Sequence, residues 1–376
     1  MRILAPGLWS YGINFTLCTW LQAIELADIP IYGVAVGTIL HIPFNLFFIH
    51  TVGWGYKGAA VATSIFQIVQ PTVTFLYIWL TESGKDRIYF NTGADVFTTS
   101  TPLSIDVQRA ICSYEGIFQY LGLAIPGVVH ISEWWAMEIT IFLSGHLPFP
   151  DIALSAMTIY QNMVLVCLKQ AAGSGVACET RVSTLLGFGD AHGTKFACRV
   201  SLVFQASLGL VLGAILYFIP HSFFPSLFTP DINIIQEVVK TIPYMILSVF
   251  ADGLQSMMRG MIKGCGRRCV IMPIVIFSDW VVGLPLAYYV TFRWSNISGL
   301  FEDLRGLIFG MVVGCWVLCL LLLLVVEFGI DWDEEVAEAQ ERLQFEHMTE
   351  IGSKTDLTFE DDEQTPLAAT EGHIIM

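Results

Sequence analysis

Charged residues are scarce in this sequence of 376 residues. Asp, Glu, Lys and Arg make up 14% of it, whereas a typical soluble domain contains about 25%. Hydrophobic residues make up 55%. Because so few charges cannot cover the surface of an ordinary globular domain, the composition excludes that class. It favours a membrane protein whose outer surface faces lipid.

Common catalytic and nucleotide-binding motifs are also missing from the sequence. It contains no GxxxxGK[ST], HExxH or GxSxG, the patterns that cradle phosphates, bind zinc or present a nucleophilic serine. The nine cysteines are scattered, without the CxxC or Cys/His spacing of a zinc site. We therefore expect no enzyme, no cofactor and no nucleic-acid partner. If the protein transports anything, the energy must come from an ion gradient.

Long apolar runs predict about nine transmembrane helices, since a helix needs about 20 apolar residues to cross a bilayer. The runs lie at residues 3–24, 29–50, 57–80, 117–143, 152–185, 193–219, 235–262, 269–292 and 306–328. A polar stretch rich in Gly, Ser and Thr separates the third run from the fourth. The sequence therefore predicts an all-α polytopic membrane protein with two lobes, residues 1–80 and 117–328, joined by a loop at 81–116.

Charge in the predicted loops gives the expected orientation. Ten Lys and Arg residues, Arg259 among them, fall in one set of alternate loops and five in the other. Positive residues accumulate on the cytosolic side of membrane proteins. This bias places the inter-lobe loop 81–116 in the cytosol, together with the acidic tail at 329–376. Much of the net charge of −15 lies in that tail.

Similarity between two parts of the sequence suggests an internal repeat. The first span opens "APGLWSYGINFTLCTWLQA" and the seventh opens "TIPYMILSVFADGLQSMMRG", each with a proline near its start. If spans one to three correspond to spans seven to nine, then spans four to six lack a counterpart. Two parallel repeats of six helices are a common plan for transporters. The pattern predicts a parent with twelve helices and a chain that lacks the first three.

Two acids interrupt the apolar stretch "ISEWWAMEITIFLSG", namely Glu133 and Glu138. A charge at the bilayer centre costs on the order of 2.5–3.5 kcal/mol on an insertion scale. The two acids lie about 140° apart around a helix and so do not share a face, whereas His130 shares the face of Glu133. Such a carboxyl binds a proton or a cation, because burial favours its neutral form and a nearby cation its charged form. A hydrogen bond to a neighbouring helix or a place at the interface is the alternative.

Three further charged positions fall inside apolar runs. Asp252, in "SVFADGLQSMMRG", is a candidate proton site, with a helix-bending acid capped by a neighbouring hydroxyl as the alternative. Asp279, in "IFSDWVVGLP", is a candidate ion-pair or cavity residue. Lys169, in "MVLVCLKQAAGSG", is a candidate ion-pair partner for one of the acids, with snorkelling to the surface as the alternative. Tyr160 is a candidate cation–π contact and Gln161 a candidate polar cavity residue, although such residues more often serve in packing and in helix–helix hydrogen bonds.

At these residues the sequence resembles the eukaryotic multidrug and toxic compound extrusion (MATE) transporters. The stretch "YLGLAIPGVVHISEWWAMEITIFLSGHLPFPD" is similar to the seventh-helix motif of that family, Pro-Gly followed by Glu-Trp-Trp-x-x-Glu and Leu-Ser-Gly-x-Leu-Pro. "GSGVACETRVSTLLGFGDAHGTK" is similar to the end of the eighth helix, and "FADGLQSMMRGMIKGCGRR" to the tenth. The resemblance covers nearly all of residues 1–328. It implies a two-lobed MATE-type bundle, with the first residue of this chain at the start of family helix four.

The resemblance also implies site residues. Glu133 and Glu138 match the two acids of the seventh-helix motif, and Asp252 matches the acid of the tenth helix. Gln161 stands after Tyr160, where the family often has a glutamate, and Lys169 departs from a usually apolar or small residue. Both changes make the expected cavity less negative than in exporters of organic cations, so the charge of the substrate stays open.

These observations predict a secondary active transporter. We expect a monomeric, proton-coupled antiporter, with sodium as the alternative ion, that exports small cationic or amphipathic organic compounds by alternating access. The membrane would be the plasma membrane or a vacuolar or other endomembrane. The first alternative is a truncated, non-transporting MATE-like protein with a scaffold or regulatory role through its tail. The second is lipid flipping by the same scaffold.

Overall fold

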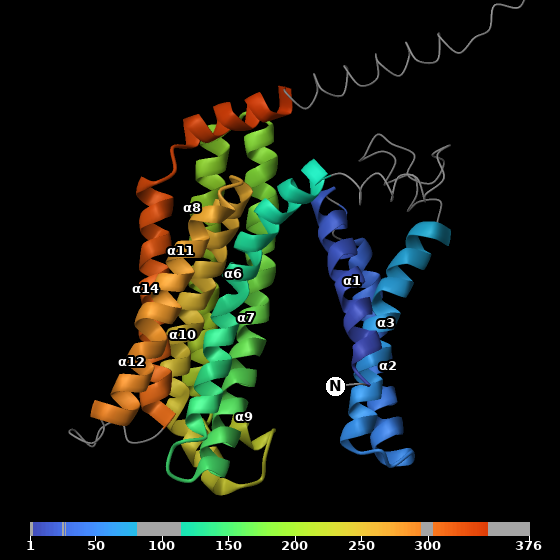
Figure 1. Ribbon diagram of the computed structural model, residues 1–376, viewed down its shortest axis with the longest axis vertical. Coiled ribbons are helices and arrows are strands. Elements are labelled where there is room, and N and C mark those ends of the chain that lie inside the picture. Colours follow the sequence, from blue (N-terminus) through green and yellow to red (C-terminus); the bar gives the residue numbers. More distant parts are fainter. Residues whose placement is uncertain (1–2, 25, 27, 81–113, 295–303, 345–376) are drawn as a thin grey trace, which may run out of the picture. The chain divides into compact units, whose positions relative to one another are not determined.

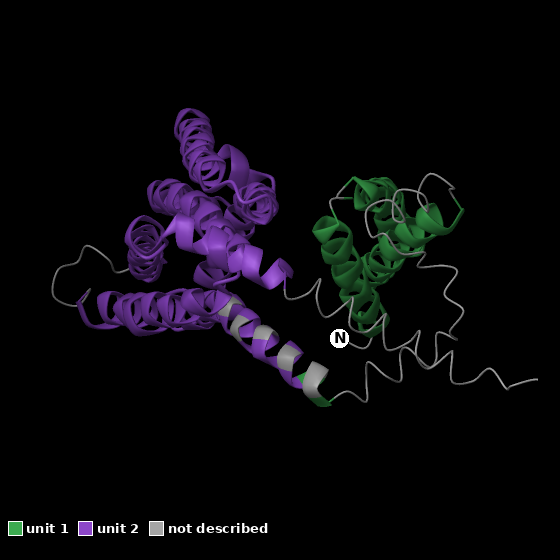
Figure 2. Cartoon of the chain, turned by 90° about the horizontal axis from the view of Figure 1, so that it is seen from above, with its two compact units in different colours: residues 1–117 green, residues 118–376 purple. Residues whose placement is uncertain are grey.

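The computed structural model describes residues 3–24, 26, 28–80, 114–294 and 304–344. They fold into helices that form two compact units, residues 1–117 and 118–376 (Figure 2). Most of the predicted loop 81–116, and the tail beyond residue 344, lie outside the described residues. Nine long helical segments are present in the described part of the chain, and their bounds lie within a few residues of the nine predicted runs.

The first unit contains α1 (Ala5–Ala23), α2 (Ile29–Leu46) with its π-helical extension η1 (Phe47–Thr51), and α3 (Tyr56–Leu80) (Figure 1). Both α1 and α2 pack on α3. A side chain at Gly33 would collide with Thr74, so the glycine allows α2 and α3 to approach closely, as small residues do between membrane helices.

The second unit begins within α6 (Tyr114–Ser144) and continues through α7 (Pro150–Gly187), α8 (Ala191–Phe218), the short α9 (Phe223–Ser226) and α10 (Ile232–Gly264). The next segment is one helical run of mixed type. Its parts are η2 (Arg268–Val270), α11 (Ile271–Val275), η3 (Ile276–Gly283), α12 (Leu284–Tyr289) and η4 (Val290–Trp294). The last long helix is α14 (Leu304–Phe328).

Seven of the described helical segments are long and apolar enough to span a membrane. Helices α1 and α6 are not among them by length and mean hydropathy. Many large apolar side chains are exposed on the outside of the helices, for example Trp9, Phe142 and Val166. Such a surface is stable in lipid and unstable in water. The prediction of an all-α polytopic membrane protein is therefore confirmed.

Helix α10 is the centre of the second unit and packs on α7, α8 and α14. Its closest approach is to α7, where a Cβ at Gly260 would collide with the carbonyl of Gly175. The Ser256 hydroxyl donates a hydrogen bond across the same contact to the carbonyl of Ala171, at 2.8 Å. Gly264 continues the contact one turn later. This small-residue seam fixes how α10 is rotated, and hence which of its side chains face inward.

A further helix, residues 332–344, follows α14 and docks on the second unit at the end that the charge bias predicts to be cytosolic (Figure 1). Glu335, 2% exposed, pairs with Arg267, and the Gln340 amide donates to the carbonyl of Gly187 at 2.7 Å. Burial raises the pKa of Glu335, and the charge of Arg267 opposes this shift. This part of the acidic tail is therefore ordered on its own chain.

Candidate functional site

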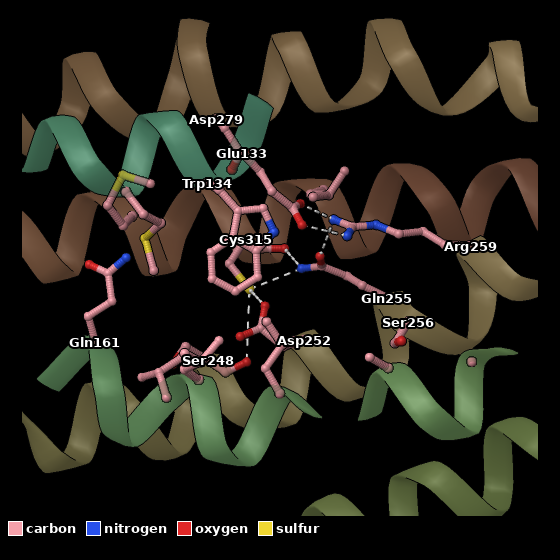
Figure 3. Close-up of a pocket in the computed structure, with 18 of the residues that line it drawn as sticks. Glu133, Trp134, Gln161, Ser248, Asp252, Gln255, Ser256, Arg259, Asp279 and Cys315 are labelled. Carbon is pink, nitrogen blue, oxygen red and sulfur yellow. Dashed lines mark hydrogen bonds and ion pairs between the residues drawn. The ribbon is translucent and has the colours of Figure 1, made fainter. Parts of the chain in front are cut away.

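The second unit contains a cavity of about 290 Å³ between α6, α7, α10, η3 and α14 (Figure 3). Apolar side chains form most of its wall, among them Met157, Leu165 and Met311. The charged residues that line it are Glu133, Glu179, Asp252, Arg259, Lys263 and Asp279. Four acids against two bases leave a formal charge of −2.

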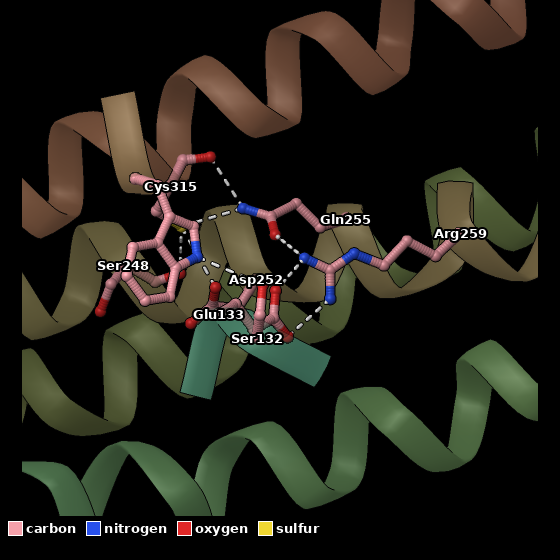
Figure 4. A network of polar contacts seen from close by, with 8 residues as sticks. Ser132, Glu133, Ser248, Asp252, Gln255, Arg259 and Cys315 are labelled. Carbon is pink, nitrogen blue, oxygen red and sulfur yellow. Dashed lines mark hydrogen bonds and ion pairs between the residues drawn. The ribbon is translucent and has the colours of Figure 1, made fainter. Parts of the chain in front are cut away.

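Glu133 and Arg259 form a two-pronged ion pair across the cavity (Figure 4). The Nη1 and Nη2 atoms of Arg259 donate to the two carboxylate oxygens of Glu133, at 2.9 and 2.5 Å. The side chain of Arg259 is 13% exposed and that of Glu133 is 22% exposed. Paired, planar contacts of this kind are among the strongest hydrogen bonds in proteins. The pair ties α6 to α10.

A chain of polar contacts continues from this ion pair to Asp252. Arg259 donates to the side-chain oxygen of Gln255 at 3.0 Å, and the Gln255 amide donates to the carbonyl of Cys315 at 2.7 Å. The thiol of Cys315 donates to Asp252 at 3.1 Å. Figure 4 shows the sequence of contacts from Glu133 to Asp252. The two acids, on α6 and α10, therefore belong to one network.

Asp279 reaches the same cavity from the π-helical segment η3. It is 5% exposed, and its Oδ2 atom has no hydrogen-bond partner among the described residues. The indole of the next residue, Trp280, donates to the hydroxyl of Ser132 at 3.2 Å, and Ser132 directly precedes Glu133. π-Helical turns occur frequently at functional sites. The wide turn thus brings both a carboxyl and a link to α6 to the cavity.

Tyr160 and Gln161 both line the cavity. Tyr160 is buried, at 3% exposed, within an apolar cluster. The side-chain oxygen of Gln161 is buried without a hydrogen-bond partner in the described part of the chain. A cavity-facing acceptor of this kind can accept a hydrogen bond from a ligand.

Two predicted site residues lie elsewhere. Glu138 is exposed and Lys169 is exposed, and neither lines the cavity. For Glu138 the reason is the five-residue spacing from Glu133, which turns it to another face of α6. Lys169 is on a face of α7 that does not line the cavity. The side chain of His130 lies outside the described part of the structure.

Sequence reasoning missed Arg259, Gln255 and Cys315. Arg259 was counted among the cytosolic loop residues, although it falls within the predicted run 235–262. This was wrong, because Arg259 lies in α10 and lines the cavity. The spacing contained a usable signal. Arg259 lies seven residues after Asp252, which is close to two full helical turns and therefore the same face.

Comparisons with known proteins agree with this architecture. The family model described as MatE matches residues 127–289. Protein DETOXIFICATION 16 of Arabidopsis thaliana is 26% identical over 349 residues, covering 91% of this chain and 65% of the relative. Protein DETOXIFICATION 11 of the same plant is 26% identical over 357 residues, covering 95% and 68%. The chain thus spans about two thirds of the length of these relatives.

Solved structures show the same fold. The crystal structure of the eukaryotic MATE transporter AtDTX14 matches with a TM-score of 0.77 and 25% identity, over 90% of this chain and 70% of that one. A MATE structure in the bent conformation matches with a TM-score of 0.65 and 16% identity, over 91% and 69%, which supports the fold alone. The fold and the charged cavity together define a multi-pass integral membrane protein of the transporter class.

Within that class, residues 127–289 match the MatE family, and the chain is similar over about nine tenths of its length to eukaryotic MATE transporters, the DETOXIFICATION proteins of Arabidopsis thaliana among them. The resemblance inferred from the sequence motifs is therefore confirmed. This is a family of transporters and not of enzymes.

Proposed function

We propose that the chain works as a proton-coupled antiporter that exports small cationic or amphipathic organic compounds by alternating access. The observation that carries the proposal is the cavity in the second unit, which is lined by carboxyl groups from α6, α10 and η3. A carboxyl in such a place binds either a proton or a cationic cargo, and the competition between the two is what an antiporter needs.

The wall of the cavity supports the cargo class. Its formal charge of −2 favours a cation, and its apolar side chains, including Trp134 and Met137, favour a molecule with a hydrophobic body. An aromatic face adds cation–π attraction for an ammonium group. A small amphipathic amine combines these properties.

The polar contacts of α6 suggest how proton binding changes the structure. α6 is tied to α10 by the pair of Glu133 with Arg259, and to η3 by the bond between Ser132 and Trp280. Protonation of Glu133 removes its charge and with it most of the attraction to Arg259. α6 can then shift, and the cavity changes its shape and its affinity for cargo.

Transport in reconstituted vesicles tests the proposal. The 376-residue chain is placed in vesicles loaded with a fluorescent amphipathic amine, and an inward proton gradient is imposed. We expect efflux that follows the gradient and is lost in Asp252→Asn. Asp151→Asn, an exposed acid at the start of α7, is the matched control. A sodium gradient tests the alternative ion, and equal efflux with and without either gradient would contradict antiport.

The scaffold alternative depends on the acidic tail. The structure offers one observation on this point, since helix 332–344 uses Glu335 and Gln340 to dock on its own chain. A tail that is held in this way favours control of the same bundle over recruitment of a partner. Vesicles that show no gradient-driven flux, together with a partner that binds the tail, would instead favour the scaffold role.

A further inference from the structure

Two polar atoms of the cavity are buried without a hydrogen-bond partner among the described residues, and they are complementary. One is the Nε donor of Arg259, and the other is the Oδ2 acceptor of Asp279. A guanidinium carries five N–H donors, and in Arg259 the donors at Nη1 and Nη2 hold Glu133 and Gln255. The Nε–H group of Arg259 can therefore donate one more hydrogen bond, and Oδ2 of Asp279 can accept one.

The charged and titratable groups that face Arg259 and Asp279 come from each wall of the cavity. They are Glu133 on α6, Tyr160 and Glu179 on α7, Asp252 and Lys263 on α10, and Cys315 on α14. The acidic groups whose charges act on Arg259 are Glu133, Asp279 and Asp252. A buried carboxyl without a partner is costly unless it holds a proton or pairs with a cation. Asp279 therefore needs one or the other.

We propose that Arg259 shares its guanidinium between Glu133 and Asp279, and that the coupling proton resides on whichever of the two carboxyls the guanidinium has left. In one state Arg259 pairs with Glu133, as observed, and Asp279 holds the proton. In the other state Arg259 pairs with Asp279 and Glu133 holds the proton. Each state contains one guanidinium, one proton and one carboxylate, so the exchange leaves the charge of the three groups unchanged. The inference rests on proton coupling and deepens the proposed function.

The exchange of Arg259 between the two carboxyls can change the contacts between helices. Asp279 adjoins Trp280, whose indole holds Ser132, and Ser132 adjoins Glu133. When Arg259 leaves Glu133, α6 loses its direct tie to α10 but keeps its bond to η3. The partner of the Arg259 guanidinium then determines whether α10 is tied to α6 through Glu133 or to η3 through Asp279. Arg259 is accordingly a positioning residue that acts through the two carboxyls, and Asp279 is a proton-binding residue.

Transport measured against pH in vesicles tests the proposal, because the two single variants shift the profile in opposite directions. In Arg259→Gln the carboxyls lose their cation, so the proton is retained to higher pH. The profile should move by about 1 to 3 pH units to the alkaline side. In Asp279→Asn the guanidinium stays on Glu133, so the profile should move to the acid side. Arg259→Lys, which keeps the charge, should return the profile towards the wild type.

The double variant separates a shared guanidinium from two independent effects. If Asp279 acts through Arg259, adding Asp279→Asn to Arg259→Gln should change little, and the double variant should stay on the alkaline side. If the double variant instead shows the sum of the two opposite single shifts, so that its pH profile returns towards the wild type, the proposal is overturned. Arg199→Gln and Asp151→Asn are the matched controls, since both residues are exposed and outside the cavity.

A second measurement does not depend on transport. Infrared difference spectra of the purified chain between alkaline and acidic buffer report the C=O stretch of buried protonated carboxyls. We expect one such band to change in Asp279→Asn and in Arg259→Gln, and to be unchanged in Asp151→Asn. An unchanged band in both cavity variants would overturn the inference. If the chain shows no flux but the bands change as expected, the proposed function fails while the inference stands.

Discussion

Replacing Glu133 by glutamine is the most informative single change, because it removes the carboxylate that holds Arg259 and keeps the shape of the side chain. Arg259 is 13% exposed, so its charge would be left in a largely buried site without its main partner. Breaking a buried ion pair by removing one partner costs about 3–5 kcal/mol. Gln255 keeps one bond to the guanidinium and Asp279 lies within its electrostatic reach. We therefore expect a loss at the lower end, about 3 kcal/mol.

Glu138→Gln provides the matched control on the same helix. Glu138 is exposed and lies outside the cavity, and such surface changes usually alter stability by less than about 0.5 kcal/mol. The free energy of unfolding of both variants can be measured in detergent by denaturant titration. In vesicles, Glu133→Gln should also abolish flux driven by a proton gradient. Equal stability and equal flux in the two variants would refute the role assigned to the ion pair.

Three further changes test other parts of the structure. Gly260→Leu should separate α7 from α10 and destabilise the protein by at least about 1–3 kcal/mol in denaturant titration, whereas Gly173→Ala, with open space around its Cβ, should not. Asp252→Asn should remove gradient-driven flux but leave the fold intact, as judged by gel filtration and circular dichroism. Burial raises the pKa of Glu335, so its proton is held more tightly in the docked helix than in a free one. Docking should therefore strengthen as the pH falls through that raised pKa, and hydrogen exchange of residues 332–344, corrected for intrinsic rates, should slow. An unchanged rate would contradict this.

The helices could be predicted from the sequence because most spans are long apolar runs, and lipid selects for this property directly. Charged residues near the end of a helix were harder to assign than the helix ends themselves. α10 is the clearest case, since Arg259 falls inside the predicted run 235–262 and was nevertheless counted with the loops. The π-helical turns of the segment 268–294 have no comparable pattern in the sequence.

The site was predicted in part. Glu133 and Asp252 stand out because an acid in an apolar run is costly unless it has a function or a partner. Glu138 and Lys169 stand out for the same reason, yet they face away from the cavity. The rotation of a helix within the bundle depends on seams such as that between Gly175 and Gly260, which involve residues far apart in the chain. Composition and spacing alone do not determine which face of each helix turns inward.

Simultaneous recording of proton and cargo movement in vesicles tests proton coupling most directly. A pH indicator inside the vesicles and a fluorescent amine would be followed in the same sample. Our account predicts that each efflux of amine is matched by proton entry, and that both disappear together in Asp252→Asn. Amine efflux without proton entry, or paired movement that persists in Asp252→Asn, would contradict it.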